Sequence, residues 1–175
     1  MNKVIGGLLL GGTLGTGLMA GFFWSFSFTV MPGLDLTDPL AAMASMQGIN
    51  LAVRNPVFFA GYFGTPLLCL LLALASFRQW RGLQRWVVLC SSLVYLLGVF
   101  AVTSAFNVPL NEQLAVLNPE LAENAGSMIG YIEEWTQWNH VRTFSSLAAF
   151  LFFSLVLMQG RRSAVQGQGV SSPVQ

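Results

Sequence analysis

The sequence predicts an all-α integral membrane protein, a four-helix transmembrane bundle with short helices in its two outer loops. Hydrophobic residues make up 54% of the 175 residues and charged residues only 9%, whereas a soluble domain carries about 25% charged residues. Four stretches contain no charged residue at all: Val4–Val30, Pro56–Phe77, Trp86–Phe106 and Thr143–Met158. A helix needs about 20 apolar residues to cross the hydrocarbon layer of a bilayer. Much of the surface is therefore expected to face lipid.

The charge-free stretches place the four spans at about 4–30, 56–77, 84–106 and 136–158, within a transmembrane domain of residues 1–160. The first stretch is much longer than the roughly 7–15 apolar residues of a signal peptide, so we expect it to be a retained span. The fourth stretch is short, and its helix is expected to begin earlier, with Ser127 as a candidate cap. Residues 161–175 are rich in Gly, Ser and Gln and predict a disordered cytoplasmic tail.

Charges are distributed unequally between the two sides of this predicted bundle. One side receives six basic residues: Lys3, Arg78, Arg81, Arg85, Arg161 and Arg162. The other side receives only Arg54 and Arg142, together with all seven acidic residues. Basic residues accumulate on the cytoplasmic side of membrane proteins, so both termini are expected there, and the short loops suit a bacterial inner membrane. The chain has no basic surface for binding nucleic acid.

The outer loops carry signals for short helices. Asp38 can cap a helix whose first position is Pro39, and in that helix Asn50 and Arg54 fall on one stripe. The pair Asn55-Pro56 marks the start of the second span. After the third span, Asn107 can cap a second short helix. In the first span, glycines repeat every four residues at positions 7, 11 and 15, which predicts close helix packing.

The stretch "WTQWNHVR", residues 135–142, gathers polar and aromatic side chains immediately before the fourth charge-free stretch. At 100° per residue, Trp135, Trp138, Asn139 and Arg142 share one helix face, whereas His140 points about 140° away, on the side of Glu133. A charged group at the margin of a membrane bundle usually faces the interior and has a partner.

For Arg142 the candidate partners are the amide oxygens of Asn50, Asn107 and Asn111 or the carboxylate of Glu112. Two interpretations remain open at this point. The cluster is either a hydrogen-bonded staple between helix ends, or the lining of a pocket that opens outward.

Several chemistries do not fit the sequence. A haem-binding bundle needs paired axial ligands, and the chain has one histidine, His140. A zinc or di-iron site needs several histidines or inward carboxylates at helical spacing, and none occurs, so no metal is expected. For His140 itself, a position at the membrane interface and a role as a base both remain open.

Four segments resemble the anthrone-oxygenase-like family of small integral membrane proteins. They are "MPGL", "MQGINLAVRNPVF", "TSAFNVPLNEQL" and "WTQWNHVRTFSSLAA", and the resemblance extends from about Phe22 to Phe150. It implies a four-span protein. It also implies oxidation of an anthrone, a small aromatic compound, to an anthraquinone by O₂ without a metal or organic cofactor.

That chemistry requires a base, hydrogen-bond donors for a developing oxyanion and an apolar aromatic pocket. The candidate catalytic residues are Arg142, Asn139 and His140. The candidate substrate-binding residues are Asn107, Asn111, Trp135, Trp138, Asn50 and Trp24. The base is the weakest assignment, since His140 points away from the others and Glu112 is a second candidate.

The alternative function is non-catalytic. In that case the chain is a small-molecule carrier or a structural partner of a membrane complex, and the Asn/Arg cluster is a staple. The sequence leaves the oligomeric state open.

Overall fold

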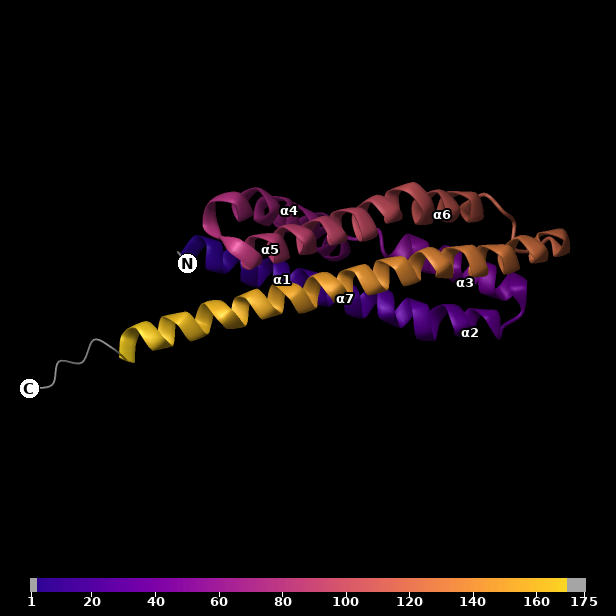
Figure 1. Ribbon diagram of the computed structural model, residues 1–175. Helices are drawn as coiled ribbons and strands as arrows, with labels where there is room; N and C mark the ends of the chain where they lie inside the picture. Colours follow the sequence, from indigo (N-terminus) through magenta and orange to yellow (C-terminus); the bar gives the residue numbers. More distant parts are fainter. Residues whose placement is uncertain (1–2, 170–175) are drawn as a thin grey trace, which may run out of the picture.

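A computed structural model describes residues 3–169 of the chain, and the side chains of residues 3–160. Every regular element in this described part is a helix (Figure 1). Four helices are long and apolar enough to cross a membrane: Lys3–Asp35, Pro56–Gln79, Gly82–Ala115 and Ala122–Gly160. The prediction of an all-α chain with four apolar helices is confirmed, and the arrangement is consistent with a four-helix membrane bundle.

Two of these long helices are composite. The first consists of α1 (Lys3–Ser25), a π-helical segment (Phe26–Val30) and α2 (Met31–Asp35). The third consists of α5 (Gly82–Tyr95), two π-helical segments (Leu96–Ala101 and Thr103–Asn107) and α6 (Val108–Ala115). The remaining elements are α3 (Pro39–Ala52), α4 (Pro56–Gln79), a short 3₁₀ helix (Ala122–Asn124) and α7 (Ala125–Gly169).

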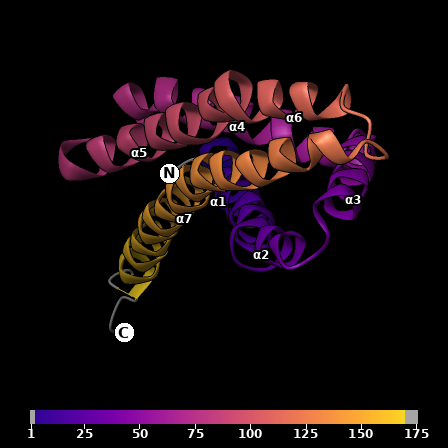
Figure 2. The same ribbon diagram turned by 90° about the vertical axis from the view of Figure 1, so that its right-hand side faces the viewer.

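The start of α1, the end of α7 and the turn between α4 and α5 lie at one end of the bundle, and α2, α3 and α6 lie at the opposite end, here called the distal end (Figure 1). The initial part of α7 runs between α6 on one side and α2 and α3 on the other (Figure 2). Further along, α7 packs against α1 and α5. It continues to Gly169, into the segment expected to be disordered, and residues 170–175 lie outside the described residues.

Small residues bring the spans close together. A Cβ atom added at Gly15 of α1 would lie 2.6 Å from Thr65 Oγ1 of α4. A Cβ atom at Gly98 would overlap the side chain of Ser145 on α7. By contrast, Gly7 faces open space, so only part of the predicted glycine stripe makes close contacts. Close approach of the backbones stabilises the association of helices in lipid, because the hydrophobic effect contributes little to helix association there.

The helix starts in the first outer loop follow local side-chain chemistry. Asp38 accepts hydrogen bonds from the backbone amides of Leu40 and Ala41 at 3.0 and 3.1 Å, with Pro39 in the first turn of α3. Asn55 accepts one from the amide of Phe58 at 2.9 Å and caps α4. Both predictions are confirmed, because an Asp or Asn cap satisfies amides that lack intrahelical partners.

The predicted caps of the later elements are wrong. Asn107 has helical dihedral angles (φ −71°, ψ −35°) and makes no capping hydrogen bond, since the third span continues through it directly into α6. Ser127 lies inside α7, which already begins at Ala125. The side chain of Asn107 instead donates to the backbone carbonyl of Trp135 on α7. Asn107, which was expected to cap its own helix, therefore connects the third span to α7.

Candidate functional site

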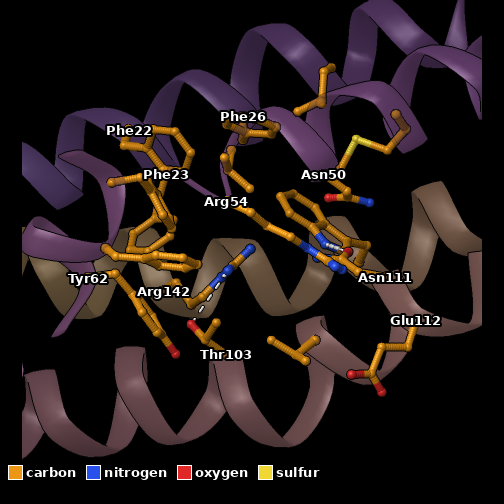
Figure 3. A pocket seen from close by; sticks show the side chains of 17 residues that line it. Phe22, Phe23, Phe26, Asn50, Arg54, Tyr62, Thr103, Asn111, Glu112 and Arg142 are labelled. Atoms are coloured by element: carbon orange, nitrogen blue, oxygen red, sulfur yellow. Dashed lines mark hydrogen bonds between the residues drawn. The ribbon is translucent and has the colours of Figure 1, made fainter. Parts of the chain in front are cut away.

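A cavity of about 320 Å³ lies at the distal end of the bundle (Figure 3), within the range of about 300–1,000 Å³ that is common for ligand sites. Seven aromatic side chains line it: Phe22, Phe23, Phe26, Phe58, Phe59, Tyr62 and Trp135. Six polar or charged side chains also line it: Asn50, Arg54, Thr103, Asn111, Glu112 and Arg142. The cavity therefore combines an aromatic wall with a few polar groups.

Two of the three π-helical segments border this cavity. Phe26 comes from the segment Phe26–Val30 and Thr103 from the segment Thr103–Asn107. A π-helical turn adds a residue to the normal helical repeat and rotates the side chains that follow, and such turns are frequent at functional sites. Here they set the angle at which the first and third spans present side chains to the cavity.

Arg142 is the buried cation of the cavity. Its side chain is only 4% exposed. The carbon of the guanidinium lies 4.6 Å from the centre of the Phe23 ring and 4.7 Å from that of Trp135. Nη1 makes one long hydrogen bond, 3.5 Å, to Thr103 Oγ1, drawn as a dashed line in Figure 3. Nε and Nη2 have no hydrogen-bond partner among the described residues.

The amide partners expected for Arg142 are bonded elsewhere, so that expectation is wrong for the described residues. Asn111 Oδ1 accepts hydrogen bonds from Tyr131 Oη and from Trp135 Nε1, both at 2.8 Å. Asn107 Nδ2 donates to the carbonyl of Trp135 at 3.1 Å. These bonds attach the end of the third span to α7. Asn111 Oδ1 and Asn107 Nδ2 are therefore used in helix packing, whereas Asn107 Oδ1 has no partner among the described residues, and neither residue bonds the guanidinium.

Asn50 behaves differently from Asn107 and Asn111. It is 9% exposed and lines the cavity from α3, and Arg54, on the same predicted stripe, lines it from just beyond the end of α3. Its Nδ2 has no hydrogen-bond partner within the described part of the chain. Asn50 and Arg142 thus both bring unpaired donors to one cavity.

Asn139 and His140 meet at Ser27, in the π-helical segment that follows α1, and neither lines the cavity. Asn139 Nδ2 donates to Ser27 Oγ at 2.7 Å and to the Phe23 carbonyl at 2.8 Å. His140 Nδ1 lies 3.0 Å from Ser27 Oγ, which is also 3.0 Å from Thr143 Oγ1. This network connects α1 to α7 and has the form of a staple. The two candidate catalytic residues are therefore close to each other but separate from the cavity lining.

The rest of the His140 environment agrees with the helical-wheel geometry. His140 borders a different hollow that it shares with Asp35 and Glu133, as expected from its position on the Glu133 side of the helix. Its ring stacks on Phe28 at a centroid distance of 5.3 Å. Within the described residues, no group of three or more His, Cys, Asp and Glu side chains is placed to hold a metal ion.

Trp138 and Trp24 also lie away from the cavity. The Trp138 ring stacks on Phe106 with centroids 3.6 Å apart and planes 9° apart. Trp24 is 49% exposed and packs against Phe28. Of the nine candidate site residues, the cavity lining therefore brings together four: Asn50, Asn111, Trp135 and Arg142.

Comparison with known proteins fits this arrangement. The chain matches the family model described as "Anthrone oxygenase" over residues 57–152, which is more than half of its length. The chain belongs to the anthrone oxygenase family. No curated protein and no solved structure matches it significantly. The region matched to the anthrone oxygenase family contains Thr103, Asn111, Trp135 and Arg142, whereas α1 and α3 lie outside it.

Several cavity residues of this anthrone oxygenase family member were not predicted from the sequence. The largest group is the aromatic wall from α1 and α4, which includes Phe22, Phe23, Phe26 and Tyr62. In an apolar span, phenylalanines carry no distinguishing signal, because lipid-facing positions use the same residues. Thr103 and Ser27 are equally inconspicuous. The helical spacing of Phe22 and Phe26, four residues apart, is the one pattern that places two of them on a common face.

Proposed function

We propose that the protein is a membrane-bound, cofactor-independent oxygenase that oxidises a small planar aromatic compound of the anthrone type in the distal cavity. The observation that carries the proposal is Arg142, a buried guanidinium with unpaired N–H groups inside an aromatic-walled cavity. Membership of the anthrone oxygenase family supports the same chemistry. We further propose that the distal end faces the outside of a bacterial inner membrane, with both termini cytoplasmic.

The proposed reaction needs O₂ as its only co-reactant. The methylene proton of an anthrone is acidic, because the resulting anion is delocalised over three rings. After a base removes this proton, the anion passes an electron to O₂, and the two radicals combine to a peroxide that takes up a proton. Loss of the second methylene proton and of hydroxide then leaves a carbonyl. One oxygen atom enters the product, and the other leaves as water.

The cavity offers a group for each of these tasks. The buried positive charge of Arg142 stabilises the oxyanion that develops as the proton leaves, and electrostatic stabilisation of this type contributes most in many enzymes. Glu112 is the one carboxylate in the lining and is the proposed base. The ring of the substrate packs against aromatic side chains such as Phe26 and Phe58. Asn139 and His140 are proposed to position α1 and α7 through Ser27 rather than to touch the substrate.

The proposal is tested by oxygen uptake and anthraquinone absorbance with detergent-purified, chelator-treated protein and unsubstituted anthrone. Arg142→Met removes the charge and the donors while keeping a similar apolar volume, and it is expected to reduce the rate to that of protein-free autoxidation. Arg78→Met is the matched control, because Arg78 is exposed at the opposite end of the bundle. Equal rates for the native protein, Arg142→Met and the blank would refute the proposal.

One observation favours the second candidate, a non-catalytic carrier or structural partner. Asn107, Asn111 and Asn139 all make hydrogen bonds between helices, as a staple requires. These bonds explain three members of the polar cluster without any ligand. They do not account for the unpaired nitrogens of Arg142, so the oxygenase proposal is preferred. Absence of turnover in the assay above would leave the non-catalytic function in its place.

A further inference from the structure

The distal cavity presents unpaired hydrogen-bond donors of one kind. Among its lining residues, the buried polar atoms without a partner in the described part of the chain are Asn50 Nδ2 and Arg142 Nε and Nη2, and all three are N–H donors. Among the acceptors of the lining, Asn111 Oδ1 already accepts two hydrogen bonds. A ligand bound at this end therefore has to supply acceptor atoms.

The charge of the lining also favours an acceptor that is negatively charged. Arg54 and Glu112 are both exposed and opposite in charge, so Arg142 is the one buried charged group of the lining. A guanidinium that is removed from water without a carboxylate partner is costly. An anion bound beside Arg142 offsets that cost, whereas a cation would add to it.

The shape of the guanidinium specifies the anion further. Nε and one terminal nitrogen of an arginine lie along one edge and direct parallel N–H bonds outward, which matches the two oxygens of a carboxylate. In Arg142 the remaining nitrogen, Nη1, contacts Thr103, while Nε and Nη2 are both unpaired. The geometry thus leaves a pair of buried nitrogens without a partner, rather than a single donor.

We propose that the cavity binds its substrate as a planar aromatic carboxylate, held by Nε and Nη2 of Arg142 with a further hydrogen bond from Asn50. The aromatic ring lies against the wall formed by residues such as Phe26 and Phe58. This inference rests on the proposed binding of an aromatic substrate in the same cavity. It adds that the preferred substrates carry an ionised acid group at the edge of the ring.

The test compares two probes of nearly equal shape, 2-naphthoate and the neutral 2-naphthamide, by calorimetric titration of the detergent-purified full-length protein. A hydrogen bond to a charged group contributes about 1.5–3 kcal/mol, so the carboxylate is expected to bind about tenfold or more tightly than the amide. Arg142→Met is expected to abolish this preference, and Asn50→Leu to reduce it several-fold. Arg78→Met should leave it unchanged. Equal affinity of the native protein for both probes would overturn the inference, and that comparison needs no variant.

The outcome is separable from that of the oxygenase assay. Turnover of unsubstituted anthrone together with equal binding of the two probes would refute the carboxylate site and leave the oxygenase intact. A clear preference for 2-naphthoate without any oxygen uptake would support the carboxylate site and refute the oxygenase. A preference that survives in Arg142→Met would place the anion elsewhere and overturn the inference.

Discussion

Substitution of Arg142 by Met separates a structural arginine from a ligand-binding one through its effect on stability. If Arg142 were a staple, its removal would break contacts that hold the helix ends together and leave their partners unpaired. The structure shows instead one long hydrogen bond, to Thr103, and two unpaired nitrogens. We therefore expect Arg142→Met to keep or raise the free energy of unfolding of the ligand-free protein.

The magnitude follows from the contacts that the substitution removes. Each unpaired buried donor nitrogen costs about 1–3 kcal/mol, and Arg142 carries two such nitrogens, Nε and Nη2. Each of the cation–π contacts with Phe23 and Trp135 contributes about 0.5–2 kcal/mol. The sulfur of Met recovers about 0.3–1.5 kcal/mol against the same rings. These effects roughly cancel, with an expected result between no change and about 2 kcal/mol of added stability. Removing one member of a buried pair would instead cost about 3–5 kcal/mol.

The assay is reversible unfolding in mixed detergent micelles, followed by far-ultraviolet circular dichroism. Arg78→Met is the control for loss of an exposed arginine. Asn139→Ala is the control for loss of a staple, since Asn139 donates two short hydrogen bonds to α1. A loss of stability in Arg142→Met as large as that in Asn139→Ala would refute the argument that this guanidinium is unpaired in the free protein.

Three further predictions follow from the packing and the charge distribution. Asn139→Ala should lower the free energy of unfolding by about 1–3 kcal/mol, measured in the same micelles, because it removes two buried hydrogen bonds between the first and fourth spans. An unchanged value would contradict the staple. Gly15→Ala should destabilise the protein by about 1–3 kcal/mol, because the added methyl group overlaps Thr65. Gly21→Ala is the control and should not destabilise it, because a Cβ atom there meets open space. Equal unfolding midpoints for the two variants would contradict the close packing. A reporter that is active only outside the cytoplasm should be silent when fused after Gln175, and a strong signal would reverse the proposed orientation.

The sequence predicts the fold well because the determining signals are local or compositional. Span lengths follow from charge-free runs, and the caps at Asp38 and Asn55 follow from the chemistry of single side chains. Asn107 is the instructive failure. The sequence "NVP" has the composition of a helix start, but a π-helical segment carries the third span through this position without a break. Packing between helices, which the local sequence does not encode, decides whether such a residue caps or bridges.

Helical periodicity predicts site residues one helix at a time. Trp135 and Arg142 were placed on one face by helical periodicity, and both line the cavity. The opposite wall comes from Phe23 on α1, and its contact with Arg142 joins residues far apart in the chain. No periodicity within one helix contains that information. The same limit explains why Asn139, although on the face of Arg142, was not recognised as a partner of Ser27.

The polar cluster combines asparagines that make hydrogen bonds between helices with a guanidinium that is largely unpaired, and the asparagines help to hold the guanidinium in place. Asn107 and Asn111 are fixed by hydrogen bonds to Trp135, so their side chains are not free to rotate toward the guanidinium of Arg142. Those bonds hold the ring of Trp135 under the guanidinium at the same time. A site that stabilises a developing charge needs donors that are oriented before the ligand arrives, because reorienting them during the reaction would consume the gain. The staples therefore do not compete with a binding role for Arg142. They keep the side chains of Asn107 and Asn111 away from the guanidinium, whose Nε and Nη2 have no partner among the described residues.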